Sequence, residues 1–90
     1  MSFFCYLLEC SDGSYYTGWS LDPEKRTVVH NAGRGARYTR MHMPVRLVYK
    51  EELPNRSSAQ KREHAIKRMS HEQKQRMITK TNLESEEDPQ

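Results

Sequence analysis

Two short apolar segments near the N-terminus are separated by a polar turn. Residues 3–10 (FFCYLLEC) are mostly apolar, and a second, aromatic segment, residues 14–19 (SYYTGW), follows the turn residues 11–13 (SDG). Short aromatic segments on either side of an Asp-Gly turn predict a β-hairpin. The first two strands are therefore expected on either side of this turn.

The length of the turn decides which side chains share a face of the hairpin. A two-residue loop of Asp12 and Gly13 would place Tyr6 and Tyr16 on opposite faces. A three-residue loop, with Gly13 in the left-handed conformation that glycine tolerates, pairs Tyr6 with Gly18 instead. We favour the three-residue loop, which makes Tyr6 and Tyr16 diagonal neighbours on one face.

A helix and then a basic loop are predicted after the hairpin. Asp22 and Pro23 form an N-cap and first-turn pair, which predicts a helix that runs to about Asn31. Residues 33–40 (GRGARYTR) are basic, contain two glycines and lack large aliphatic side chains. This composition favours a mobile loop, although a short helical turn near Tyr38 also fits the sequence.

One more strand and two more helices are predicted in the second half of the chain. Residues 45–50 (VRLVYK) alternate in hydrophobicity with period two, which predicts a third strand. Two Ser-x-x-Gln patterns, beginning at Ser57 and Ser70, resemble capping boxes and predict the starts of two helices. The second of these helices is expected over residues 70–80.

The composition fits one small domain. The chain has 90 residues, of which 34% are hydrophobic and 30% charged, so its core must be small. No apolar segment approaches the ~18 residues of a membrane span, and no signal sequence is evident, which predicts a soluble cytoplasmic protein. Cys5 and Cys10 would point to opposite faces of a strand, so no disulfide is predicted, as suits a reducing compartment.

Charge is distributed unevenly along the chain. Residues 1–80 contain fifteen Lys and Arg against eight Asp and Glu, whereas residues 81–90 contain four acids and one large apolar residue, Leu83. So little apolar surface cannot offset the entropy of ordering, and we expect a domain at residues 1–80 and a disordered acidic tail at residues 81–90. No acid but seven Lys and Arg lie between Glu24 and Glu51. This predicts a polyanionic partner, nucleic acid above all, although a merely soluble basic surface would have the same pattern.

The side chains suited to catalysis are dispersed along the chain. No Cys and His spacing matches a zinc site, and no phosphate-binding loop is present. The polar residues that remain as candidates are Tyr6, Tyr16, Arg26, His30 and Glu63. Each alone has an ordinary explanation, as a packed strand tyrosine, a solvated arginine, a surface histidine or, for Glu63, an i,i+4 ion pair with Lys67.

The order of these residues resembles that of the GIY-YIG nuclease domain. The resemblance rests on Phe4-Cys5-Tyr6, on Tyr16-Thr17-Gly18 ten residues later, on Arg26 and His30 in the following helix, and on Glu63 in a later helix. Residues 30–40 and 55–67 also resemble the small stand-alone branch of that family, so the resemblance spans residues 3–80. Phe4 and Cys5 replace the glycine and isoleucine of the first motif, and Thr17 replaces the isoleucine of the second.

The resemblance implies an α/β (α+β) fold in which a small three-stranded antiparallel sheet is flanked by helices. It also implies a metal-dependent endonuclease that hydrolyses phosphodiester bonds in nucleic acid, DNA first of all. By similarity, Glu63 would hold one divalent cation, Mg²⁺ or Mn²⁺, and Arg26 would bind the non-bridging phosphate oxygens. Tyr6 and Tyr16 would bond to water and phosphate, and either a tyrosine or His30 would be the general base, unless His30 only orients a tyrosine. A phenol needs nearby positive charge to lower its pKa for that role.

Nucleic acid is expected to contact the basic loop and the later helix. The residues expected to make these contacts are Arg34, Arg37, Tyr38, Arg40 and Lys67. Tyr38 could stack on an unpaired base or could anchor the loop by packing. Two other functions stay open, a non-catalytic nucleic-acid-binding module on the same scaffold and a small adaptor whose basic face binds an acidic protein. The protein is taken to be a monomer.

Overall fold

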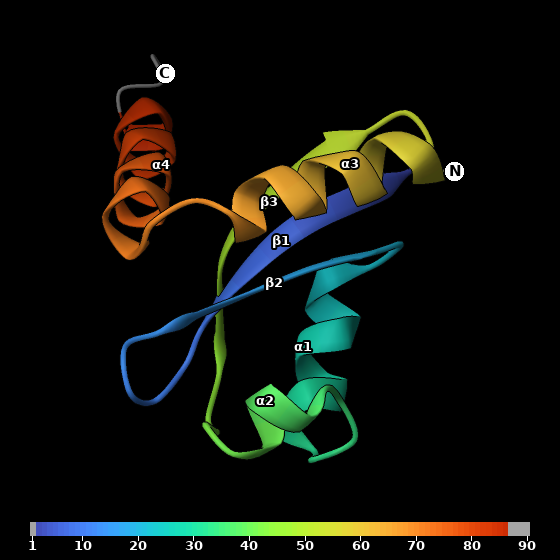
Figure 1. Ribbon diagram of the computed structural model, residues 1–90, viewed down its shortest axis with the longest axis vertical. Coiled ribbons are helices and arrows are strands. Elements are labelled where there is room, and N and C mark those ends of the chain that lie inside the picture. Colours follow the sequence, from blue (N-terminus) through green and yellow to red (C-terminus); the bar gives the residue numbers. More distant parts are fainter. Residues whose placement is uncertain (1, 87–90) are drawn as a thin grey trace.

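The described part of the chain, residues 2–86 of a computed structural model, combines a small sheet with helices on both of its faces (Figure 1). Its elements in chain order are β1 (Phe3–Glu9), β2 (Tyr15–Ser20), α1 (Pro23–Asn31), α2 (Arg37–Arg40), β3 (Arg46–Leu53), α3 (Arg56–Lys67) and α4 (His71–Glu86). The three strands are antiparallel in the order β2-β1-β3. The predicted α+β class and its three-stranded sheet are confirmed. Within residues 2–86, no helix has the length and apolar character needed to cross a membrane.

The β1–β2 hairpin has the three-residue turn that the sequence favours. Gly13 has a φ of 86°, and its N–H donates to the carbonyl oxygen of Cys10 at 2.9 Å. The N–H of Cys10 donates across the turn to the carbonyl oxygen of Ser14 at 2.8 Å. Tyr6 consequently pairs with Gly18, which confirms the predicted register.

The central strand β1 is buried on both faces. Cys5 and Leu7 point to a core beneath α3 and α4, whereas Tyr6, Leu8 and Cys10 point to a second core on the opposite face. Alternate side chains of a strand point to opposite faces, so a middle strand that is covered on both sides is apolar throughout. Both cysteines are free and lie in different cores, as predicted.

The helix starts agree only in part with the sequence signals. The carboxylate of Asp22 accepts the N–H of Lys25 at 3.0 Å and so caps α1 at the predicted position. α3 begins at Arg56 because the side chain of Asn55 caps it, so the predicted cap at Ser57 is wrong by two residues. At Ser70 the predicted capping box is present, with Gln73 as its reciprocal partner.

Three segments are more regular than predicted. Residues 33–40 contain the short helix α2, so they are only partly a loop. β3 continues three residues beyond the predicted strand. α4 continues to Glu86, so the predicted helix end at Lys80 is wrong, because residues 81–86 (TNLESE) contain neither glycine nor proline to stop a helix. Residues 87–90 of the predicted acidic tail lie outside the described residues.

Candidate active site

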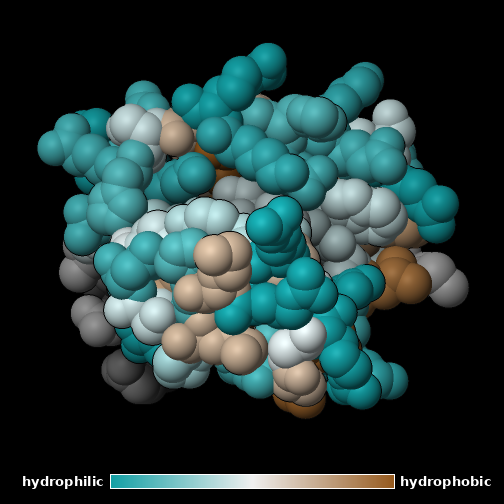
Figure 2. Space-filling model, turned by 60° about the horizontal axis from the view of Figure 1, so that its bottom comes forward, coloured by the Kyte–Doolittle hydropathy of each residue, from teal (hydrophilic) through white to brown (hydrophobic). Residues whose placement is uncertain are grey.

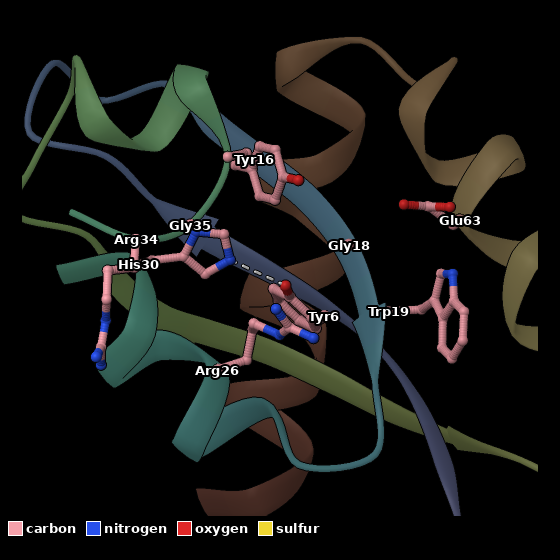
Figure 3. Close-up of a pocket in the computed structure, with 10 residues that line it drawn as sticks. Tyr6, Tyr16, Gly18, Trp19, Arg26, His30, Arg34, Gly35 and Glu63 are labelled. Atoms are coloured by element: carbon pink, nitrogen blue, oxygen red, sulfur yellow. Dashed lines mark hydrogen bonds between the residues drawn. The ribbon is translucent and has the colours of Figure 1, made fainter. Parts of the chain in front are cut away.

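The candidate site lies at the exposed edge of the sheet, beside β2. A pocket of about 330 Å³ opens there, between α1 with the loop that follows it and α3 (Figure 3). The predicted residues that line it are Tyr6, Tyr16, Arg26, His30, Arg34 and Glu63. The fold therefore brings together six residues that lie between positions 6 and 63 of the sequence, because an edge strand exposes both faces of the sheet to one pocket.

Tyr6 is held in place by the glycine opposite it on β2. The tyrosine is only 2% exposed, and its ring lies across Gly18. A Cβ atom at Gly18 would lie 2.6 Å from the Tyr6 hydroxyl oxygen and 2.7 Å from the carbon that carries it. Any side chain at position 18 would therefore displace the phenol, which is the physical reason for glycine in the second motif.

A chain of hydrogen bonds runs from the Tyr6 hydroxyl into the protein. This hydroxyl lies 3.2 Å from Nε2 of His30, and Nδ1 of His30 lies 2.8 Å from the hydroxyl oxygen of Thr39. Thr39 donates its single hydroxyl proton to the carbonyl oxygen of Ala36, at 2.8 Å. Thr39 must therefore accept from the Nδ1–H of His30, which leaves Nε2 to accept from the O–H of Tyr6.

The electrostatics agree with this assignment of protons. Burial lowers the pKa of His30, and the positive charge of Arg26 lowers it further, so the imidazole is neutral at neutral pH. Burial also raises the pKa of Tyr6 above its ordinary range, and Tyr16 adds to the rise. Arg26 does lower the pKa of Tyr6, as expected of nearby positive charge, but burial outweighs it. Without a ligand, Tyr6 is thus a neutral phenol that donates to a neutral histidine.

Sequence reasoning missed two residues that hold His30. Thr39 is fully buried and fixes the orientation of the imidazole through Nδ1. Gly35 lies so close to the ring that a Cβ atom there would be 2.1 Å from Nδ1. Both residues belong to the segment predicted to be a mobile loop, and no local pattern marks them. The Gly33-x-Gly35 spacing is their only sequence signal, and the fold shows that Gly35 is needed for close packing.

Glu63 approaches the pocket from the opposite face of β2, on the side of Trp19 (Figure 3). Its side chain is 16% exposed, and one carboxylate oxygen lies 3.5 Å from Nζ of Lys67, so the predicted i,i+4 ion pair is present. Among the described residues, no group of three or more His, Cys, Asp or Glu side chains could hold a metal ion. A single carboxylate in an open pocket suits a hard cation such as Mg²⁺, which keeps several water ligands and takes others from phosphate.

The basic loop lies mostly outside this pocket. Arg34 lines the pocket, whereas Arg37 and Arg40 are exposed on α2. Figure 2 shows this end of the molecule, where hydrophilic surface surrounds a smaller apolar patch. The hydroxyl group of Tyr38 donates a hydrogen bond to the hydroxyl oxygen of Ser14 at 2.6 Å. The ring of Tyr38 also stacks on the ring of His42, with the two ring centroids 4.3 Å apart. These contacts favour the loop-anchor interpretation of Tyr38 over a free stacking platform.

Comparison with known proteins places this geometry in a family. The GIY-YIG catalytic domain matches residues 2–76. The UPF0213 protein SSP2268 of Staphylococcus saprophyticus is 46% identical over 76 residues, which cover 84% of this chain and 93% of that protein. The UPF0213 protein CPE1444 of Clostridium perfringens is 45% identical over 83 residues, which cover 92% of this chain and 89% of that protein.

Two solution NMR structures are similar in fold. The protein EF2693 of E. faecalis has a TM-score of 0.61 and 39% identity, with 92% of this chain and 88% of that chain covered. The UPF0213 protein BH0048 of Bacillus halodurans has a TM-score of 0.56 and 38% identity, with 88% of this chain and 84% of that chain covered. On sequence and fold together, the chain belongs to the GIY-YIG family and, within it, is similar to the small UPF0213 proteins.

Proposed function

We propose that this protein is a metal-dependent endonuclease that hydrolyses phosphodiester bonds in nucleic acid, with DNA as the first substrate to test. The observation that carries the proposal is the convergence of Tyr6, Tyr16, Arg26, His30 and Glu63 on one pocket. Phosphodiester hydrolysis requires an activated water, positive charge at the phosphate and support for the leaving oxygen. These five side chains are of the types that supply such functions.

Two arginines supply the positive charge for the phosphate. Arg26 on α1 and Arg34 in the following loop both line the pocket, and both are exposed at its surface. A guanidinium group offers planar, paired N–H donors, which match two oxygens of one phosphate. The non-bridging oxygens of the scissile phosphate would therefore lie between these two arginines.

The hydrogen-bond chain supplies a route for the proton of the attacking water. The Tyr6 oxygen accepts a proton from water while its own proton moves to Nε2 of His30, and the water oxygen forms the new bond to phosphorus. The bond from phosphorus to the leaving oxygen breaks, and that oxygen takes a proton from solvent. Thr39 keeps Nε2 free for this task by accepting from the other ring nitrogen. In this scheme Tyr6 relays the proton and His30 is its final acceptor, which addresses the choice between tyrosine and histidine that the sequence leaves open.

Glu63 is the residue that would hold the divalent cation, Mg²⁺ or Mn²⁺. When bound, such an ion supplies positive charge to the phosphate and to the leaving oxygen. Glu63 would exchange its ion pair with Lys67 for the metal, since one carboxylate oxygen already faces the pocket.

We further propose a cytoplasmic location, which the two free, buried cysteines suit.

The proposal is tested by incubating the protein with single-stranded, duplex, flapped and branched DNA and RNA, in Mg²⁺, Mn²⁺ or EDTA. Glu63→Gln is compared with Glu72→Gln, because both glutamates form an i,i+4 ion pair at 3.5 Å and Glu72 lies on α4, outside the pocket. We expect metal-dependent cleavage that falls by about 100-fold or more in Glu63→Gln and is unchanged in Glu72→Gln. Binding by the wild type without cleavage of any substrate would favour the non-catalytic binding module instead.

A further inference from the structure

A second groove borders the active pocket on the far side of Tyr16. Its volume is about 310 Å³, and its walls come from β2, α2, α3 and α4. The residues that line it are Tyr15, Tyr16, Thr17, Tyr38, Lys67 and Lys74. Tyr16 lines both hollows, and Lys67 reaches the active-site carboxylate of Glu63 at 3.5 Å. The groove therefore adjoins the site proposed for phosphodiester cleavage.

The groove is positively charged and none of the residues that line it is acidic. Lys74 forms no ion pair with a carboxylate among the described residues, and burial, with a smaller contribution from the positive charge of Lys67, lowers its pKa. Two lysines thus face the same hollow from different helices, and of the two only Lys67 has a carboxylate partner, Glu63. The groove thus has the charge of a phosphate site.

The floor of the groove also holds an unpartnered hydroxyl group. Thr17 is 3% exposed, and its side-chain oxygen has no hydrogen-bond partner among the described residues. Leaving a buried hydroxyl unsatisfied costs about 1–3 kcal/mol, so a partner is expected. Thr17 lines the hollow between the tyrosines and the lysines, but its hydroxyl oxygen is itself fully buried, so a ligand oxygen would become its partner only if the side chain rotated toward the groove.

We propose that this groove binds a second phosphate of the nucleic acid strand whose scissile phosphate lies in the active pocket. The proposal rests on the proposed function, since the strand must pass the ring of Tyr16 from one hollow to the other. Lys74 and Lys67 bind the phosphate oxygens, and Lys67 becomes available when Glu63 takes a cation. The groove thereby fixes the direction in which the strand leaves the active pocket, toward α4.

The test measures binding without cleavage. The affinity for an end-labelled oligonucleotide is followed by fluorescence anisotropy in EDTA over a range of salt concentrations, for wild type, Lys74→Gln and Lys74→Arg. Lys80→Gln is the matched control, because Lys80 is exposed on the same helix and does not line the groove. Loss of one phosphate contact lowers the slope of log K against log salt by about 0.7 to 0.9, which is about five- to eightfold in affinity at 0.1 M salt.

We expect this loss in Lys74→Gln, with the slope kept in Lys74→Arg and Lys80→Gln. A wild-type slope in folded Lys74→Gln would overturn the groove proposal and would leave the proposed nuclease activity untouched. If the wild type cleaves no substrate but the salt slope is reduced in Lys74→Gln, the nuclease proposal is refuted and the groove remains a strand-binding site. Inorganic phosphate is titrated in parallel. If Lys74→Gln weakens phosphate binding but leaves the salt slope of the oligonucleotide unchanged, the groove is a site for a free anion, and the proposal is overturned.

Discussion

Replacing Gly18 by alanine should displace the Tyr6 phenol and slow cleavage. The Cβ atom of an alanine would lie 2.6 Å from the Tyr6 hydroxyl oxygen, whereas ordinary contact begins at 3.4 Å. The phenol must therefore move by about 0.8 Å, which is enough to break a hydrogen bond to His30 that is already 3.2 Å long. Tyr6 is buried, and the ring carbon that carries its hydroxyl would also lie 2.7 Å from the new Cβ atom. Rotation of the hydroxyl group alone therefore does not relieve the contact.

The structure gives a magnitude for both effects of Gly18→Ala. A displacement of about 1 Å at a reacting group costs about 100-fold in rate, so we expect cleavage to slow by that factor. Crowding a packed site costs about 1–3 kcal/mol of unfolding free energy, and each kcal/mol lowers the melting temperature of a domain of this size by about 4–8 °C. The cleavage rate is measured under single-turnover conditions, and the melting temperature by circular dichroism.

The matched control is Gly13→Ala in the hairpin turn. Gly13 has a φ of 86° with no atom within 4 Å of a new Cβ, so alanine there costs about 1–2 kcal/mol of backbone strain without touching the site. Gly13→Ala should thus lower the melting temperature and leave the cleavage rate unchanged. A folded Gly18→Ala protein that cleaves at the wild-type rate would refute the claim that the contact between Tyr6 and His30 matters for catalysis.

Two further predictions concern proton transfer and the attachment of β3. Because burial and Arg26 hold the pKa of His30 below its ordinary value of about 6.5, the single-turnover cleavage rate should fall with decreasing pH at a midpoint below 6.5, where His30 becomes protonated. A midpoint at or above 6.5 would contradict a neutral His30 as proton acceptor. The side-chain amide of Asn31 donates to the carbonyl oxygen of Val45 at 2.9 Å and accepts its N–H at 2.8 Å, and Val45 is buried. Asn31→Ala should therefore lower the unfolding free energy in a urea titration by about 2–4 kcal/mol, and a change below about 0.5 kcal/mol would show that water replaces the amide.

Local chemistry made much of the scaffold predictable. Gly13 at the third turn position set the hairpin register, and the register placed Tyr6 beside Gly18 and on the same face as Tyr16. The pair of Asp22 and a following proline fixed the start of α1, which carries Arg26 and His30. These signals act within a few residues of one another, so they can be read without knowledge of the fold.

The parts that could not be predicted depend on contacts between distant segments. Thr39 reaches His30 only because the loop after α1 folds back into α2, and its composition gave no sign of this. Gly35 is needed for a close approach to the imidazole rather than for an unusual backbone angle, since only Gly13 and Gly33 have positive φ among the described glycines. Likewise, Lys74 enters the groove beside Tyr16 only through the docking of α4, which no local pattern encodes.

The chemical assignment of the candidate residues followed a different route. Tyr6, Tyr16, Arg26 and Glu63 were proposed from a family resemblance, and the fold adds the observation that they share one pocket. The high pKa of Tyr6 could not be expected from sequence, because it results from burial against Gly18 and His30. Burial therefore changes the expected role of Tyr6 from a phenolate base to a neutral phenol that passes its proton on.

The central claim is that the Tyr6 hydroxyl carries the proton of the attacking water in phosphodiester hydrolysis. Its most direct test is the single-turnover rate of metal-dependent cleavage by Tyr6→Phe, compared with Tyr49→Phe. Tyr49 also carries a hydrogen-bonded hydroxyl, which donates to Glu51 at 2.6 Å, but it packs against the other core, away from the pocket. We predict that Tyr6→Phe slows cleavage by about 100- to 10,000-fold and that Tyr49→Phe does not change the rate. Equal rates for the two folded variants would contradict the account.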